Sequence, residues 1–400
     1  MASFEREKLF PRFLEILKAA LRGEKIAPDE DTRKLFPQIY RLATEQNVLP
    51  LIADCLFDET QKGIALCARE VTVKQAQRMA DFLLLLRALE EHGLKPAVIK
   101  GIVCRSLYPV PELRPSTDED LLIDPEEYQG YRKVLQENGF CTNRDEDDYE
   151  VMFVAADRDL ALELHKSLFP EESEAYGDCG RFFEGALARA EDRTIGGVTV
   201  RTLSPTDHLL FLICHAYKHF LHGGVGIRQI CDLGMMAEKD GGRTDWKKIR
   251  SACEELHIET FAAALFRITE RHLGFAMPEA FADFTVDESD LLADCLSGGL
   301  YGVLDIDRAH SSTMTLEAVG AERRSRRRRG VLHSVFLPLS AMRGHFPYLN
   351  KYPWLLPVAW IQRIWRYLRR KQHRDPIHPT RSVRIARERI ELLREYRIIE

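Results

Sequence analysis

The sequence lacks the features that would place the chain in a membrane or among disulfide-rich proteins. No apolar run reaches the ~18–20 residues that a membrane-spanning helix needs. No apolar stretch follows the charged residues after Met1, as it would in a signal peptide. The nine cysteines are scattered, without a C-x-x-C pair or another spacing typical of metal ligands. We therefore expect reduced cysteines that pack in the core of a cytoplasmic protein.

Length and composition leave room for real hydrophobic cores. The chain has 400 residues, of which 45% are hydrophobic, and this is enough for two or three domains. The order of strand and helix patterns predicts an α+β fold in which helical regions flank a small mixed-sheet core. We expect four parts: an N-terminal helical region, the core, a helical domain and a basic helical C-terminal region, over 1–95, 96–203, 204–310 and 311–400.

Positive charge is scarce in most of the chain and concentrated near its C-terminal end. The net charge is −5 at pH 7. Residues 321–400 hold 20 lysines and arginines against 6 acidic residues, a balance of +14, so the rest of the chain carries −19. Such segregation indicates that the basic part contacts an anionic partner or the acidic body of the protein itself.

A basic block at 323–329 precedes a tryptophan-rich stretch at 353–365, and more basic residues follow up to Lys371. Three tryptophans beside arginines resemble a segment that lies at a membrane interface, here through 323–371 at the inner membrane surface. One alternative is that the aromatic face packs on the helical domain and leaves the arginines in solvent. Contact with an RNA backbone is another, because arginines pair with phosphates.

Apolar periodicity and turn residues locate most elements. Helices are expected where apolar residues recur at helical spacing, and the third includes a core run of four leucines at 83–86. Strands are expected in short apolar or alternating runs, including a hairpin that turns at Gly196-Gly197. The main helices are predicted over 5–22, 32–56, 73–92, 125–138, 205–222, 228–239, 245–257 and 278–300, and the strands over 97–99, 121–123, 149–155, 159–166 and 194–200. The polar segment 313–330 reads as a loop or a helix end.

The most specific motif is Arg114-Pro-Ser-Thr-Asp118-Glu-Asp120, which runs into an apolar stretch. On a strand, residues two apart point to the same side, so the two aspartates would lie together. Two neighbouring carboxylates repel each other unless a positive charge holds them, most simply a divalent cation. A solvated turn before a strand is the structural alternative. Arg114 would either contact a phosphate or form a surface ion pair.

Residues on either side of this motif fit the same chemistry. Upstream, Lys100-Gly101 follows a short strand and precedes a short helix over 102–108, and such a turn suits a phosphate. Downstream, Glu163 and His165 share one face of a strand, which makes Glu163 the third acid of the group. His165 either contacts a substrate or is a satisfied histidine at a strand end.

The helix over 205–222 carries four histidines within about 60° of one another. They are His208, His215, His219 and His222. The spacing of His215 and His219 is that of a metal-binding pair, but the H-E-x-x-H glutamate is missing, which excludes a zinc hydrolase of that type. Contact with a base or a phosphate, with Lys218 nearby, is the functional interpretation. A polar face between domains is the structural one, as is an ion pair between Arg228 and Asp232 on the next helix.

Together these motifs resemble the polymerase-beta-like nucleotidyltransferases, and among them a bacterial branch of uncharacterised nucleotidyltransferases. The resemblance covers about 33–249, with echoes near 348–363. It rests on Lys100-Gly101, the Arg114–Leu122 motif, Glu163-Leu164-His165 and the helix start at Pro205. The chain departs from the superfamily at Ile102, where standard members carry a serine that holds a phosphate. Lys100 or Ser106 would have to substitute for it.

The resemblance implies a nucleotidyltransferase core over 96–203. It implies Mg²⁺-dependent transfer of a nucleoside monophosphate from an NTP, ATP by default, to an acceptor hydroxyl of a small molecule, a protein or RNA. It implies that Asp118, Asp120 and Glu163 are catalytic and bind two Mg²⁺ ions, with Mn²⁺ as the alternative. The residues expected to contact the nucleotide and its phosphates are Lys100, Gly101, Arg114, His165, His215, Lys218 and His219.

Two other functions stay open at this point. The fold could be retained as a catalytically weak nucleotide-binding module whose basic tail docks to a membrane or nucleic acid. The missing serine favours this interpretation, and the complete set of acids disfavours it. The third interpretation is a peripheral membrane enzyme that acts in surface-polysaccharide assembly.

Overall fold

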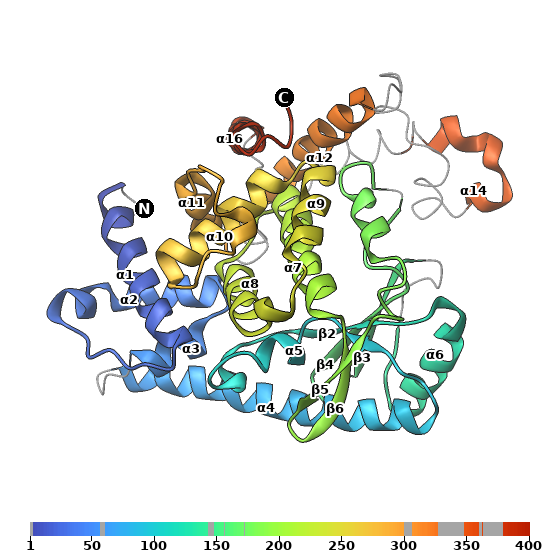
Figure 1. The fold of residues 1–400 in the computed structure, drawn as a ribbon, viewed down its shortest axis with the longest axis horizontal. Helices are drawn as coiled ribbons and strands as arrows, with labels where there is room; N and C mark the ends of the chain where they lie inside the picture. The colour runs from blue at the N-terminus through green and yellow to red at the C-terminus, as the bar shows by residue number, and fades with distance from the viewer. Residues whose placement is uncertain are drawn as a thin grey trace.

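The computed structural model describes residues 3–56, 61–142, 148–155, 157–171, 173–299, 306–326, 348–359, 362 and 379–400. A six-stranded mixed sheet lies between the long helix α4 on one side and the helices around α7 and α8 on the other (Figure 1). This agrees with the mixed strand and helix core flanked by helices that the sequence predicts. The expected division into four parts stays a prediction.

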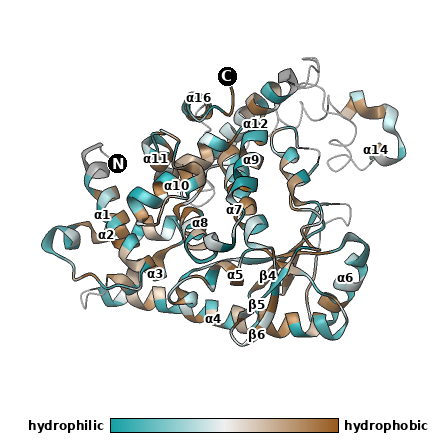
Figure 2. Ribbon diagram, in the orientation of Figure 1, coloured by the Kyte–Doolittle hydropathy of each residue, from teal (hydrophilic) through white to brown (hydrophobic). Residues whose placement is uncertain are grey.

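Four helices precede the sheet: α1 (Ser3–Leu21), α2 (Glu30–Glu45), α3 (Leu49–Cys55) and α4 (Lys62–Glu91). The helix predicted over 32–56 is split, because Pro50 stands at the first turn of α3 and favours a new helix start there. Helix α4 is longer than predicted and alternates hydrophilic and hydrophobic residues along its length (Figure 2). The leucine run in α4 was expected in the core, but only Leu85 is fully buried and Leu84 is 61% exposed.

The sheet has the strand order β3-β4-β2-β1-β6-β5. Strand β2 pairs in parallel with β4 and antiparallel with β1, and β1 pairs in parallel with β6. Both predicted hairpins are present, as the antiparallel pairs β3–β4 and β5–β6. The strands are β1 (Ala97–Val98), β2 (Asp118–Leu122), β3 (Glu150–Ala155), β4 (Leu160–His165), β5 (Glu191–Ile195) and β6 (Val198–Thr202).

Short helical segments connect the strands. The helix expected over 102–108 is only one turn long, α5 (Ile102–Arg105). The helix expected over 125–138 divides into a 3₁₀ turn with proline at its start and α6. The connecting segments are η2 (Pro111–Leu113), η3 (Pro125–Glu127), α6 (Tyr128–Glu137) and η4 (Gly177–Phe183).

Helix α7 (Pro205–His222) begins where the sequence predicts. The Ser204 hydroxyl accepts a hydrogen bond from the Asp207 N–H at 3.2 Å, which caps the first turn. The segment 313–330, whose conformation the sequence left open, belongs in part to α12. The later elements are α8 (Ile227–Asp240), η5 (Gly241–Arg243), α9 (Trp246–Leu256), α10 (Glu259–Leu273), η6 (Glu279–Phe281), α11 (Ser289–Gly298), α12 (Ile306–Arg326), α14 (Tyr348–Lys351), η9 (Pro353–Leu355) and α16 (Pro379–Glu395).

Sheet and helices share one continuous hydrophobic core. Phe153 of β3, Phe211 of α7 and Tyr396, which follows α16, all belong to it. A second, small cluster is centred on Leu349 and Ala359. Beside it Trp354 is 73% exposed, so this tryptophan does not pack on the helical domain as one interpretation of the sequence held.

Most of the basic segment is outside the described residues, including Trp360, Trp365 and the arginines of 327–329 and 366–370. The membrane contact expected through 323–371 therefore stays a prediction. Among the helices that the structure describes, none is both long and apolar enough to cross a membrane.

The C-terminal end of α7 is held by side chains from α12 and α16. The last carbonyl groups of a helix lack partners within it and must find them elsewhere. Here Thr315 Oγ1 donates to the Leu221 carbonyl at 2.7 Å, and the Arg389 guanidinium donates to the Phe220 carbonyl. The position of α7 over the sheet thus depends on residues far along the chain.

We predict that Thr315→Val lowers the free energy of unfolding by about 1–2 kcal/mol, because it leaves the buried Leu221 carbonyl without a donor. The measurement is the urea midpoint at fixed pH. Thr72→Val is the matched control, since the Thr72 hydroxyl bonds only the Ala68 carbonyl of its own helix among the interactions described. Equal effects of the two substitutions would show that Thr315 does not hold α7.

Candidate functional site

Strand register brings two of the predicted acids together. The parallel pairing of β2 with β4 places Asp120 beside Glu163 and Asp118 beside Ala161. Since side chains alternate along a strand, Asp118, Asp120 and Glu163 all lie on one face of the sheet. The strand begins at Asp118, so both aspartates are within it rather than ahead of it, as the range predicted for the strand implied.

Asp120 is the most enclosed acid of this face. Its side chain is 1% exposed, and its Oδ1 atom lies 2.9 Å from Lys100 Nζ and 3.2 Å from His165 Nε2. Burial raises the pKa of Asp120, but the two positive neighbours outweigh burial and the pKa lies below its ordinary value. Asp120 is therefore a carboxylate that carries its charge inside the protein.

His165 bridges the two strands. Its Nε2 atom lies 3.2 Å from Asp120 Oδ1 and 3.6 Å from Glu163 Oε2. Burial lowers the pKa of His165, but the two carboxylates more than compensate and raise it to about 9. Asp120, Glu163 and His165 also offer ligand atoms that lie within 4.8 Å of one another, close enough to share a metal ion.

The pKa of Asp118 is shifted in the opposite direction from that of Asp120. Burial and the charge of Asp120 both raise its pKa, and the positive charges of Lys100 and Arg228 only partly offset this. Burial and the neighbouring carboxylate therefore destabilise the charged form of Asp118 more than the two cations stabilise it. A further cation beside Asp118 would relieve that repulsion.

The acid between the two aspartates is one of the residues that sequence reasoning missed. Glu119 points to the opposite face of β2, is 1% exposed, and accepts a hydrogen bond from the Ile102 N–H at 2.7 Å and from the Arg105 guanidinium. Arg105 also donates to Gln75 of α4 at 3.1 Å. The sequence signal was alternation itself, which sends the middle residue of D-E-D to the other side.

Glu119 explains why residue 101 is a glycine, whereas the expected phosphate contact of Gly101 stays a prediction. A Cβ atom on Gly101 would stand 1.8 Å from Glu119 Oε2, and the φ of Gly101 is +48°. The glycine thus makes room for the protein's own carboxylate at the start of α5. That start, which was expected to receive a phosphate, already holds an anion.

Two of the four histidines of α7 reach the acidic face. His215 Nε2 lies 3.1 Å from Lys100 Nζ and 3.1 Å from His219 Nε2. Burial and the charge of Lys100 hold the pKa of both histidines well below the ordinary value, so both are neutral at pH 7. The other two lie elsewhere: His208 is close to Thr202 of β6, and His222 contacts the Tyr176 hydroxyl at 3.0 Å.

Arg114 is not on the surface, as one interpretation of the sequence held. It is 3% exposed and donates from Nε and Nη2 to Asp232 at 2.9 and 2.5 Å. It is thus part of a buried ion pair rather than a surface one, and two of its nitrogens already have a carboxylate partner. Asp232 accepts hydrogen bonds from Arg114 and from the Tyr108 hydroxyl at 2.8 Å. Burial raises the pKa of Asp232, but Arg114 and the expected partner Arg228 lower it below its ordinary value. Arg228 also donates to the Pro115 carbonyl.

Lys218 lies at the β3 side of the site. Its Nζ contacts the Tyr149 hydroxyl at 2.9 Å and lies 3.8 Å from Glu150 Oε2. Glu150 is opposite His165 in the β3–β4 register, so it extends the row of acids by one strand. Sequence reasoning missed Glu150, although the alternation of the strand places it on the same face as His165.

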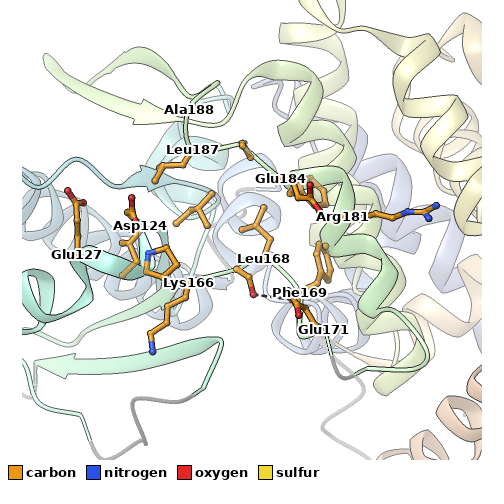
Figure 3. A pocket seen from close by; sticks show the side chains of 18 of the residues that line it. Asp124, Glu127, Lys166, Leu168, Phe169, Glu171, Arg181, Glu184, Leu187 and Ala188 are labelled. Atoms are coloured by element: carbon orange, nitrogen blue, oxygen red, sulfur yellow. Dashed lines mark hydrogen bonds between the residues drawn. The ribbon is translucent and has the colours of Figure 1, made fainter.

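A large cavity lies apart from these acids (Figure 3). It has a volume of about 930 Å³ and is lined by charged and apolar side chains, among them Asp124, Lys166 and Phe169. The Phe169 ring packs on Phe211, which in turn packs on His215. Aromatic rings therefore stand between this cavity and the acidic face.

Comparison with known proteins agrees with these motifs. A family model described as uncharacterised nucleotidyltransferase matches residues 34–274. No curated protein is significantly similar to the chain. Among solved structures, the solution structure of the antibiotic-resistance factor ANT(2'')-Ia is similar to part of it. That match has 16% identity and a TM-score of 0.32, and it covers 48% of this chain and 97% of that one. A likeness of that size carries no argument about function.

We predict that Gly101→Ala destabilises the protein by about 2–4 kcal/mol, because the new Cβ collides with Glu119 in a backbone conformation that L residues rarely adopt. Gly63→Ala is the matched control: this helical glycine has open space around its Cβ position, and the change should stabilise by about 0.5–1 kcal/mol. Chemical denaturation measures both. A Gly101→Ala protein as stable as the wild type would refute the role of Glu119 at this turn.

The raised pKa of His165 predicts that the metal-free protein loses stability at alkaline pH. Its contribution is fully present below about pH 6.5 and is lost as the pH rises through 9, because the folded state gives up the proton later than the unfolded state. Urea midpoints between pH 6.5 and 9.5, in EDTA, should fall more steeply for the wild type than for His165→Gln. The exposed His92→Gln should follow the wild type. Parallel slopes for all three proteins would contradict the prediction.

Proposed function

Since the chain belongs to the family of uncharacterised nucleotidyltransferases, which spans residues 34–274, we propose a specific reaction for it. It transfers a nucleoside monophosphate from a nucleoside triphosphate, ATP by default, to the hydroxyl of an acceptor. One observation carries this proposal. The β2–β4 register gathers Asp118, Asp120 and Glu163 on one face, opposite basic and histidine side chains of Lys100 and α7.

The acids fit a divalent cation, and we propose that they hold two Mg²⁺ ions. Carboxylate oxygens are the ligands that Mg²⁺ prefers. The raised pKa of Asp118 is consistent with the assignment, because burial and the charge of Asp120 disfavour its carboxylate in the absence of a further cation. Asp120 and Glu163 offer oxygens close enough to share an ion, and Asp118 is two residues from Asp120 on the same face. Bound Mg²⁺ would supply positive charge for the phosphates of the nucleotide.

The chain's own residues supply the remaining chemistry. The acceptor oxygen forms a bond to the α-phosphorus, the bond to the β-phosphate oxygen breaks, and pyrophosphate leaves. Glu163, with a side chain 20% exposed, accepts the hydroxyl proton at a carboxylate oxygen. Lys100 carries a mobile ammonium group at the edge of the site, where it can turn from Asp120 toward the phosphates. His215 and His219, both neutral, line the wall that α7 provides.

A catalytically weak nucleotide-binding module is the second candidate. The observation that favours it is the occupied turn at Gly101, where Glu119 takes the place of a phosphate and no serine follows the glycine. Binding without turnover would be its signature. The acceptor is a small molecule, a protein or RNA, and the cytoplasm is the compartment that we propose.

We predict that purified protein with Mg²⁺, α-labelled NTPs and a cell extract transfers label to an acceptor. Asp120→Asn should lower this transfer by about 10²-fold or more, since removing a charge that acts in the transition state costs several kcal/mol. Asp192→Asn, an exposed strand aspartate on β5, is the matched control and should keep full activity. The mobility of the labelled product identifies the class of acceptor.

Three results would decide between the candidates. Transfer by the wild type and the control alone establishes the enzyme. Binding of NTP by folded wild-type protein, without transfer to any acceptor, would favour the binding module. Equal transfer by Asp120→Asn would show that the acidic face is not the site.

A further inference from the structure

A small cavity opens beside Asp118, and Gly101 is part of its lining. Its lining combines carboxylates of β2 with donors of α8 and with Arg114. Two of these donors are unusual. Among the residues that the structure describes, neither Arg114 Nη1 nor Gln229 Nε2 has a hydrogen-bond partner, and both atoms are buried. The residues of the lining are Lys100, Gly101, Arg114, Ser116, Asp118, Asp120, Leu212, His215, Arg228, Gln229 and Asp232.

Buried donors without partners are costly, which makes them informative. An unmade hydrogen bond on a buried polar group costs about 1–3 kcal/mol, more when the group is charged. Arg114 is 3% exposed, and its Nε and Nη2 atoms are already satisfied by Asp232. Its remaining nitrogen therefore lacks an acceptor, and a ligand that brings one would remove the cost.

The first turn of α8 borders the same cavity. Gln229 Oε1 accepts a hydrogen bond from the Gly226 N–H at 3.0 Å, so the oxygen of this side chain is used to cap the helix. The amide nitrogen of Gln229 is thereby left as a donor toward the cavity. Arg228 precedes it in the same turn, where the positive end of the helix dipole also favours an anion.

The charged side chains around the cavity also favour an anionic ligand. Lys100 and Arg228 both belong to the lining of the cavity and bring positive charge to this end of β2. The Asp232 carboxylate faces Arg114 and the Tyr108 hydroxyl and is already satisfied. Among the described residues, the donors of the lining that remain without a partner are Arg114 Nη1 and Gln229 Nε2, and such N–H groups suit the oxygens of a phosphate.

We propose that this cavity is the phosphate subsite of the enzyme. It receives the terminal phosphates of a nucleoside triphosphate on Arg114, Arg228 and Gln229, in place of the turn at Gly101 that Glu119 occupies. The inference rests on the proposed nucleotidyl transfer and adds the residues that hold the leaving pyrophosphate. Two of these residues, Arg228 and Gln229, belong to α8, which is separate in sequence from the D-x-D motif.

The side chain of Lys100 controls access to this subsite. The free space is about 20 Å³, close to that of one water molecule, so a phosphate group enters only when a wall side chain moves. Lys100 is a flexible side chain of that wall and is 16% exposed. When its ammonium group leaves Asp120, the mouth of the cavity widens and the positive charge can follow the phosphate.

Gln229→Glu is the sharpest test, because it keeps the oxygen that caps Gly226 and turns the buried donor into a negative acceptor. Calorimetric titration of the full chain with inorganic tripolyphosphate, in EDTA, measures anion binding without metal. We expect about tenfold weaker binding or more for this variant. Gln129→Glu, on exposed α6, adds the same charge away from the cavity and should bind like the wild type.

A second variant covers the case in which Gln229→Glu does not fold. Arg228→Gln removes a positive charge from the same turn and should weaken tripolyphosphate binding by about tenfold. Arg87→Gln, on the exposed side of α4, is its control. Titration with ATP in parallel distinguishes a nucleotide triphosphate from free inorganic phosphates as the ligand. Thermal unfolding of each variant confirms that it is folded.

The outcomes separate this inference from the proposed function. If the wild type transfers label from NTP and folded Gln229→Glu and Arg228→Gln keep its KM for NTP and its affinity for tripolyphosphate, the subsite lies elsewhere although the enzyme is real. If the wild type transfers no label but binds tripolyphosphate in a way that Gln229→Glu abolishes, the anion site stands and the transferase proposal falls. Wild-type protein that binds neither anion would overturn the subsite.

Discussion

The parallel register of β2 and β4 is the constraint on which the site depends. It places Asp120 and Glu163 side by side, with Asp118 two residues away, and like charges at such spacing must be compensated. Lys100 and His165 provide that compensation from the protein itself. Asp120 is thereby kept ionised inside the fold, and a bound cation would compete with these positive side chains for the acids.

Both faces of strand β2 carry a buried carboxylate that needs positive or hydrogen-bonding partners. One face presents the two aspartates to the helices of the C-terminal half, and the other presents Glu119 to Arg105 and the N-terminus of α5. The two solutions differ in kind. Glu119 accepts hydrogen bonds from fixed donors of the fold, whereas burial and the neighbouring Asp120 raise the pKa of Asp118, which we propose as a metal ligand.

Local patterns in the sequence were enough for the elements and for part of the site. Period-two alternation correctly put Asp118 with Asp120 and Glu163 with His165, and the serine, proline and aspartate at 204–207 fixed the start of α7. Partners distant in sequence were beyond such patterns. Arg114 and Asp232 are 118 residues apart, and nothing near either residue signals that they form a pair. The contact between Gly101 and Glu119 was beyond such patterns for the same reason, since strand pairing brings Glu119 to the glycine.

The hydrogen bonds from α12 and α16 to the end of α7 affect the order in which the protein folds during synthesis. The Phe220 carbonyl finds its donor in Arg389, 169 residues further along the chain. Domains generally begin to fold during synthesis, N-terminal parts first. The sheet with its acids can therefore form early on the ribosome, while the helix that faces them acquires this anchor only after Arg389 has been synthesised. Maturation of the site is thus coupled to the synthesis of a helix that lies far beyond the sheet in the sequence.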